Sequence, residues 1–142
     1  WYNAGRYPTY SFAIRRNALM KSGVRFSHLF GGGAKYSNGE DSLFLKALCD
    51  KGLRILAVPV CIGEEAERES TWFHGYNEKF FFDRGVLYHF LYGKLAVLMG
   101  ARFVYTKKSF MCKEIPANKA FNLLKRGIVK GKQEDRELKK KA

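Results

Sequence analysis

The chain has 142 residues, 46% of them hydrophobic and 15% aromatic, and its 26 basic and 13 acidic side chains give a formal net charge of +13. This length and apolar content suit one domain with a buried core and exclude a disordered chain. The three cysteines form no CxxC pair and are odd in number, which argues against a zinc ribbon or a disulfide framework and fits a reducing compartment.

Hydrophobic periodicity predicts strands and helices along the chain. Alternation over residues 9–15 predicts a strand, and residues 16–22 predict a short helix that ends at a glycine. After a glycine-rich loop, a helix is expected from about residue 38 to 51, followed by a second strand over residues 53–58. The aromatic and apolar stretch 77–105 is expected to be helical.

This last stretch is too often interrupted by charges to cross a membrane. Its uncharged runs, residues 85–93 and 95–101, fall short of the roughly 18–20 apolar residues that a span needs. Four small residues and one histidine share one side of the expected helix, and the small ones predict a close approach of another backbone, from a neighbouring domain, a second copy or a membrane surface. The five residues are Gly85, His89, Gly93, Ala96 and Gly100.

The basic charge is concentrated in the last third of the chain. Residues 101–142 carry 13 basic and 4 acidic side chains, so the final charged run is typical of a solvated, disordered tail. Before that run, Phe121, Leu124 and Ile128 share one helical face among basic residues, a pattern that suits an anionic membrane surface. No RNP-like strand, zinc finger or recognition helix is found, so nucleic acid is not expected as a partner.

Two adjacent carboxylates, Glu40 and Asp41, open the expected central helix. Acidic residues in a first helical turn are favoured by the helix dipole alone, which is one explanation for them. Asp41, however, is in register with the apolar residues that should face the sheet, and glycines precede it, so a substrate could approach closely. Since adjacent helical side chains point about 100° apart, the two acids cannot do the same job.

Residues 10–62 resemble the second half of a family-2 glycosyltransferase with the GT-A fold. The resemblance rests on the order and spacing of RRNALMKSG, the aromatic Phe26, GED and KGLRI with its following strand. Residues 70–100 are similar to the C-terminal extension of bacterial enzymes that make cell-surface polysaccharides. The resemblance implies an α/β fold with the acceptor-side part of the transferase domain in residues 1–65, a helical extension in 66–106 and a basic tail in 107–142.

The resemblance further implies inverting transfer of a sugar from a nucleotide-sugar donor to a hydroxyl group of a glycan or lipid-linked acceptor. In the family the acidic pair supplies the catalytic base, a role that falls to Asp41, with Glu40 beside it at the acceptor site. Lesser candidates have simpler alternatives as surface or packing residues. They are Gly32, Gly33 and Gly39 for close substrate approach, Arg16 for a donor phosphate, Trp1 for stacking on a sugar, and His74 as a metal ligand.

The chain departs from the family in lacking the nucleotide-binding half. No DxD motif occurs in the 142 residues, and the sequence starts at Trp1 without a methionine, so a fragment that is inactive alone is expected. The complete enzyme would use a divalent cation, Mg²⁺ or Mn²⁺, to neutralise the leaving diphosphate.

Two rival hypotheses remain open. A basic module could dock on membranes or nucleic acid through residues 101–142, or the exposed edge of a half-sheet could pair two copies into a homodimer. The expected location is the cytoplasm, peripheral at the inner face of the membrane.

Overall fold

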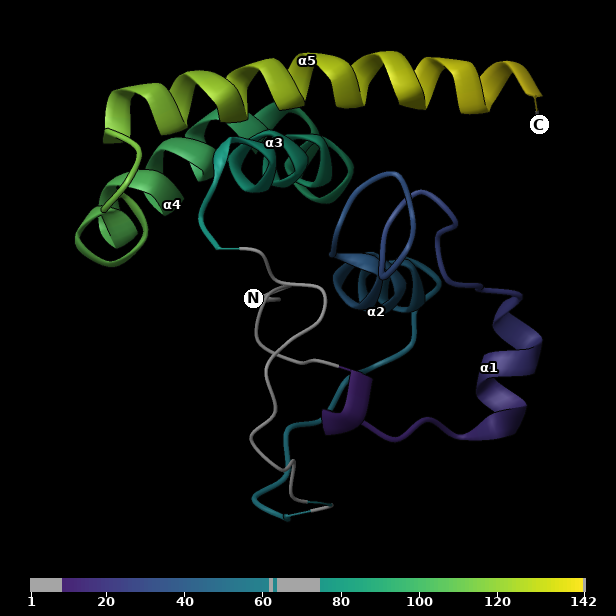
Figure 1. Ribbon diagram of the computed structural model, residues 1–142. Coiled ribbons are helices and arrows are strands. Elements are labelled where there is room, and N and C mark those ends of the chain that lie inside the picture. The colour runs from purple at the N-terminus through teal and green to yellow at the C-terminus, as the bar shows by residue number, and fades with distance from the viewer. Residues whose placement is uncertain (1–8, 62, 64–74, 142) are drawn as a thin grey trace.

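The computed structural model describes residues 9–61, 63 and 75–141, and most of these residues are helical (Figure 1). The α-helices are α1 (Arg16–Ser22), α2 (Glu40–Asp50), α3 (Glu78–Tyr92), α4 (Ala96–Met111) and α5 (Ala117–Lys141), with 3-10 turns at Thr9–Ser11 and Gly93–Leu95. The long α5 lies across α3 and α4, and α2 lies on the other side of α3, next to α1 (Figure 1).

The predicted α/β fold is wrong for the described part of the chain, which holds no strand and so lacks the sheet of a GT-A domain half. Residues 9–11 form a 3-10 turn, residues 12–15 and 53–58 have no regular secondary structure, and neither segment pairs with a strand among the described residues. The one β-bridge found there joins Phe30 to Tyr36. A strand depends on ladder hydrogen bonds to a neighbour, and an alternating pattern cannot reveal whether that neighbour exists. Leu56, in the second segment, is consequently 81% exposed.

The two predicted helices of the first half are confirmed. α1 ends at Gly23, whose φ of 66° is the left-handed conformation that glycine adopts most easily. α2 runs over Glu40–Asp50 and buries its apolar side against α1 and the irregular segments before α1 and after α2. Buried in this cluster are Phe44, Leu45 and Leu48, and packed against them are Phe12, Ile14, Leu19, Val24 and Leu53.

The stretch predicted as one helix, residues 77–105, forms two. α3 begins after Asn77, whose side chain accepts a hydrogen bond from the backbone N–H of Phe80 at 2.9 Å, and it ends at Gly93. Gly93 has φ 53° and ψ −117°, which breaks the helix and redirects the chain into α4. The stripe of small residues is therefore divided between two helices, because the pattern gave no sign that Gly93 interrupts it.

Glycines nevertheless bring two backbones together, as predicted, but the second backbone belongs to α5. A Cβ on Gly85 of α3 would lie 2.1 Å from the carbonyl oxygen of Leu124. A Cβ on Gly127 of α5 would lie 2.0 Å from the carbonyl oxygen of Phe82. Neither position has room for a Cβ, so the glycines let the backbones of α3 and α5 approach each other closely.

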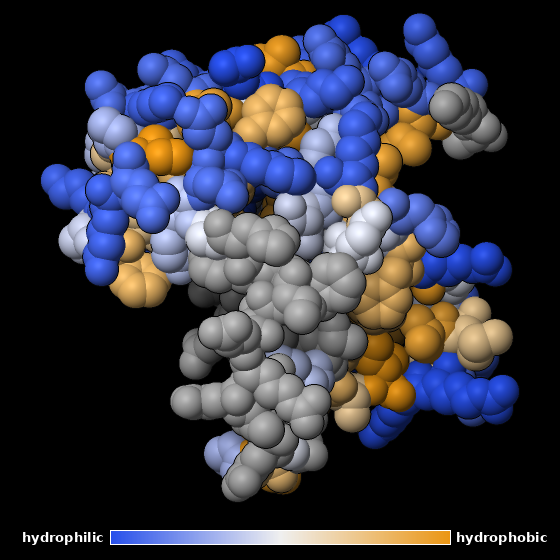
Figure 2. Space-filling view, in the orientation of Figure 1, coloured by the Kyte–Doolittle hydropathy of each residue, from blue (hydrophilic) through white to orange (hydrophobic). Residues whose placement is uncertain are grey.

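The C-terminal segment is helical, and this corrects the prediction of a disordered tail. The residues of α5 that pack on α3 and α4 recur at helical spacing. They are Ala120, Leu123, Leu124, Gly127, Gly131 and Glu134. The apolar face that the sequence assigned to a membrane thus packs inward, with Leu124 buried and Phe121 and Ile128 half-buried against the same cluster. Basic side chains cover the outward side, as the hydrophilic surface along α5 shows (Figure 2).

The described helices include none that is both long enough and apolar enough to cross a bilayer.

Candidate functional site

The glycine-rich loop of residues 31–39 leads directly into the first turn of α2, where Glu40 and Asp41 lie. The loop closes as a tight turn, because the backbone N–H of Gly31 donates to the carbonyl of Tyr36 at 3.0 Å and that of Tyr36 donates to Leu29 at 3.0 Å. Gly31 adopts a φ of 118° and Gly39 a φ of 114°, conformations that side chains other than glycine rarely reach.

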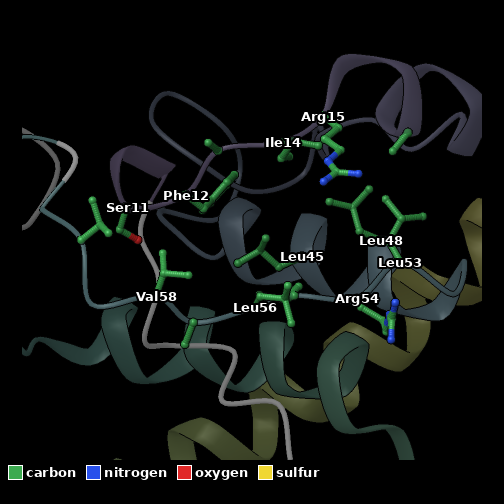
Figure 3. A pocket seen from close by; sticks show the side chains of 15 residues that line it. Ser11, Phe12, Ile14, Arg15, Leu45, Leu48, Leu53, Arg54, Leu56 and Val58 are labelled. Atoms are coloured by element: carbon green, nitrogen blue, oxygen red, sulfur yellow. The ribbon is translucent and has the colours of Figure 1, made fainter.

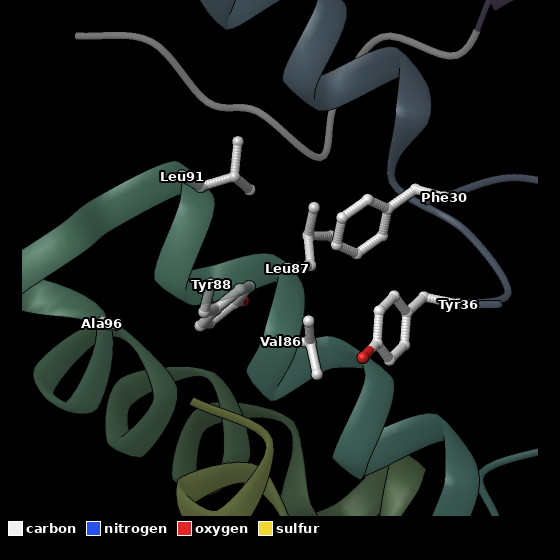
Figure 4. Close-up of a cluster of buried hydrophobic side chains, with 7 residues drawn as sticks. All are labelled: Phe30, Tyr36, Val86, Leu87, Tyr88, Leu91 and Ala96. Atoms are coloured by element: carbon white, nitrogen blue, oxygen red, sulfur yellow. The ribbon is translucent and has the colours of Figure 1, made fainter. Parts of the chain in front are cut away.

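Two aromatic rings fix this loop on α3. Phe30 and Tyr36 are buried, with ring centroids 5.2 Å apart, and belong to the same hydrophobic cluster as Val86 and Leu87. The two rings point toward these α3 residues in Figure 4. Residues 30–36 are therefore attached to the helical part of the molecule by apolar contacts at both ends of the turn.

Two buried acids, one on α3 and one on α5, hold the polar groups of the loop. Asp83 accepts hydrogen bonds from the backbone N–H of Ser37 at 3.0 Å and from its hydroxyl at 2.8 Å. Glu134 accepts from the hydroxyl of Tyr36 at 3.0 Å and from the ammonium of Lys35 at 2.5 Å. The conformation of the loop before α2 thus depends on residues about 46 and 98 positions away in sequence.

The electrostatics of Glu134 follow from these partners. The hydrogen bond from Lys35, with further ones from Lys130 and Tyr36, lowers the pKa of Glu134 to about 2, although burial opposes the shift. Burial, together with the hydrogen bond to Glu134, raises the pKa of the Tyr36 hydroxyl. The carboxylate is therefore ionised and the phenol is protonated at neutral pH, which is the combination their hydrogen bond requires.

Sequence reasoning missed both of these acids. Asp83 is a single charge inside the aromatic and apolar run FFFDRGV, and Glu134 lies on the same helical side as Leu123, Leu124 and Gly127. Each was visible as a charge at a position where the helical pattern calls for a buried residue. Glu134 was not recognised as a buried acid because the final charged run was interpreted as a solvated, disordered tail.

The side chains of the two predicted site acids, Glu40 and Asp41, point in different directions. The carboxylate of Glu40 lies against Gly31, where an added Cβ would come within 3.1 Å of the carboxyl carbon. Asp41 is half-buried one position further along α2. Glu40 thus contacts the loop, and Asp41 points in a different direction, as the 100° rotation between neighbouring helical residues demands.

The remaining predicted residues fall at several places. Gly32 and Gly33 are exposed in the turn, and Arg16 is exposed at the start of α1. Trp1 and His74 lie outside the described residues, so their proposed roles in sugar stacking and metal binding stay predictions.

Gly39 has a packing role that the sequence did not indicate. A Cβ at this position would lie 2.5 Å from a methyl carbon of Leu87, so the start of α2 closely approaches α3.

We expect Gly39→Ala to lower the free energy of unfolding by about 2–3 kcal/mol, because it adds both the strain of a positive φ and this overlap. Urea unfolding followed by circular dichroism measures the loss. Gly33→Ala is the matched control, since Gly33 has a φ of 79° but open space around it and should show the backbone strain alone. Equal losses in the two variants would contradict a role for the Leu87 contact.

A hollow of about 590 Å³ lies beside α2 and is lined by the two segments that precede α1 and follow α2 (Figure 3). Leu45 and Leu48 of α2 line it, together with residues 11–15 and 53–58. Its walls are mainly apolar, and neither Glu40 nor Asp41 is among its lining residues.

The described residues contain no group of three or more His, Cys, Asp or Glu side chains that could hold a metal ion. His89 contacts Asp135, with 3.4 Å between its Nε2 and a carboxylate oxygen, and His28 is exposed. The divalent cation that the resemblance implies therefore finds no ligand set in this part of the chain.

Comparison with family models, with curated proteins and with solved structures finds no match to this chain.

Proposed function

We propose that residues 10–62 supply the acceptor side of an inverting glycosyltransferase, in which Asp41 is the catalytic base. The observation that carries the proposal is the position of Asp41, half-buried in the first turn of α2 and directly preceded by the glycine-rich loop. The order and spacing of the sequence elements that resemble family-2 transferases support the same assignment.

The reaction asks little of the protein beyond one well-placed carboxylate. Asp41 takes the proton of an acceptor hydroxyl while the oxygen forms a bond to the anomeric carbon of the donor sugar. The bond between that carbon and the diphosphate oxygen breaks, the nucleoside diphosphate leaves, and the anomeric configuration is inverted. The acceptor is a hydroxyl group of a glycan or of a lipid-linked sugar.

The anchored loop supports this role because a base must be held within hydrogen-bond reach of its substrate. Asp83 holds the backbone N–H of Ser37, Glu134 holds the side chains of Lys35 and Tyr36, and the close approach of Gly39 to Leu87 packs the start of α2 against α3. We assign Asp83 and Glu134 as positioning residues, which act on Asp41 through the loop. Glu40, whose carboxylate lies against Gly31, contributes to the same loop conformation.

We expect the nucleotide-sugar donor to bind outside the 142 residues of this chain. The 142 residues contain no DxD motif, and the described residues offer no metal site, so no step through a metal is assigned to this chain. We expect the chain alone to transfer no sugar and to bind no nucleotide-sugar.

The test is Asp41→Asn in the product of the complete reading frame that encodes this chain. We expect the transfer rate from a radiolabelled nucleotide-sugar to fall by about 10²-fold or more, the usual contribution of a general base, with nucleotide binding unchanged. Asp50→Asn, at the exposed C-terminal end of the same helix, is the matched control and should keep the full rate. Turnover retained in Asp41→Asn would remove Asp41 from this role, and a complete protein without transferase activity would overturn the proposal.

A further inference from the structure

α4 and the turn before it carry a row of exposed apolar side chains on the side away from the buried core. Leu95, the last residue of that turn, is 56% exposed, Leu98 is 65% exposed and Tyr105 is 50% exposed. These positions follow the spacing of one helical side, opposite the side on which Ala96, Gly100 and Val104 are buried. Exposed apolar residues are ordinary when they are scattered, but a row on one helix face is not.

Basic side chains accompany this row in the turn before α4 and on α4 itself. Lys94 precedes it, Arg102 lies one turn after Leu98, and Lys108 lies one turn after Tyr105; all three are exposed. We call the surface formed by Lys94, Leu95, Leu98, Arg102, Tyr105 and Lys108 the α4 face. None of its residues is acidic, so its charge is entirely positive.

The α4 face continues onto the neighbouring side of α5. The ring of Tyr105 lies 6.0 Å from that of Phe121, and the ammonium of Lys125 lies 5.1 Å from the centre of the Phe121 ring. α5 and most of α4 lie within residues 101–142, which carry 13 basic and 4 acidic side chains, and one of those acids, Glu134, is buried in ion pairs. The surroundings of the α4 face therefore strengthen its positive potential.

We infer that the α4 face docks on a bilayer surface that contains anionic lipids. An amphipathic helix with basic residues beside its apolar side lies in the plane of the interface, with its apolar side chains at the boundary between headgroups and acyl chains. Leu95, Leu98 and Tyr105 would occupy that boundary, and the flanking cations would contact lipid phosphates.

Lipid fits these residues better than nucleic acid does. A phosphate backbone attracts lysine and arginine, but it offers no apolar surface for two leucines, and only Tyr105 could stack on a base. Residues 120–142 are a poorer candidate for membrane contact, because the apolar side of α5 packs against α3 and α4. It does not depend on the proposed transferase function.

The test measures co-sedimentation of the chain with vesicles of phosphatidylcholine, with and without phosphatidylglycerol. We expect binding only to the vesicles with anionic lipid, and we expect it to weaken as salt rises from ~0.01 M to ~1 M, where the Debye length falls from ~30 Å to ~3 Å. Leu98→Asp should reduce the partition coefficient about 10-fold or more, because it places an acid in the centre of the face. Arg102→Gln combined with Lys108→Gln should reduce the preference for anionic lipid.

Leu138→Asp is the matched control, because it makes the same change near the far end of α5, away from α4 (Figure 1). It should bind nearly as well as the unsubstituted chain, and circular dichroism checks that both variants keep their helices. Loss of binding in Leu138→Asp but not in Leu98→Asp would overturn the assignment to α4. Equal binding to neutral vesicles, no binding to either kind, or binding to single-stranded RNA in preference to anionic vesicles would overturn the inference itself.

Discussion

Replacement of Gly127 by alanine is expected to cause a net loss of about 2–3 kcal/mol in the free energy of unfolding, a large share of the 5–15 kcal/mol of a typical domain. The added Cβ would lie 2.0 Å from the carbonyl oxygen of Phe82 and 3.0 Å from the Cα of Gly85. Both are backbone atoms, so no side chain can rotate away to relieve the overlap. Alanine favours a helix over glycine by about 1 kcal/mol, and the overlap must exceed this gain for the prediction to hold.

Urea unfolding of the two chains, followed by far-ultraviolet circular dichroism, gives the difference. Asn122→Ala serves as the control, because Asn122 is exposed on the same helix, and alanine there should leave stability unchanged or raise it slightly. Gly127→Val should be more harmful than Gly127→Ala, since it adds two further carbons at the same point. A chain with Gly127→Ala as stable as the original would show that α3 and α5 do not pack this closely.

Glu134→Gln is expected to lower the free energy of unfolding at neutral pH and to weaken the dependence of that free energy on pH. A pKa of about 2 for Glu134 in the folded chain, against an ordinary value of 4.5, corresponds to about 3 kcal/mol. Because the side chain of Lys35 is 55% exposed, water weakens this ion pair, and we expect about 2 kcal/mol.

The direction of this pH dependence follows from the lowered pKa of Glu134. The carboxylate stabilises the folded chain fully above pH 4.5, where the unfolded form is also ionised, and this contribution disappears as the pH falls toward 2. Urea unfolding at pH 7 and at pH 3 should therefore differ less for Glu134→Gln than for the original chain. Glu137→Gln, an exposed neighbour on α5, is the control. An unchanged acid dependence in Glu134→Gln would rule out this ion pair as its source.

Local signals in the sequence predicted the helices of the first half well. α1 and α2 have apolar residues at helical spacing and glycines at their ends, and these features act within a few residues of one another. The predicted position of Glu40 and Asp41 in the first turn of α2 is confirmed for the same reason.

The strands and the tail were wrong because their outcome depends on distant residues. The alternation over residues 53–58 is real, but a strand requires a neighbour, and the described chain provides none. The helical face of Phe121, Leu124 and Ile128 was visible in the sequence, but it packs on α3 and α4 instead of a membrane, and the charged run after it continues the same helix. Asp83 and Glu134 escaped notice likewise, since their partners lie about 46 and 98 positions away.

The dependence of the early loop on Glu134 has a consequence for synthesis on the ribosome. Residues 35–37 leave the exit tunnel long before α5 is translated, so Tyr36 cannot donate to Glu134 until that helix arrives. Contacts between such distant residues form slowly, and until they do, the turn before α2 relies on its own backbone hydrogen bonds and on its contacts with α3, which include the hydrogen bonds from Ser37 to Asp83. The loop next to Asp41 is thus among the first parts of this chain to be made and among the last to reach its final shape.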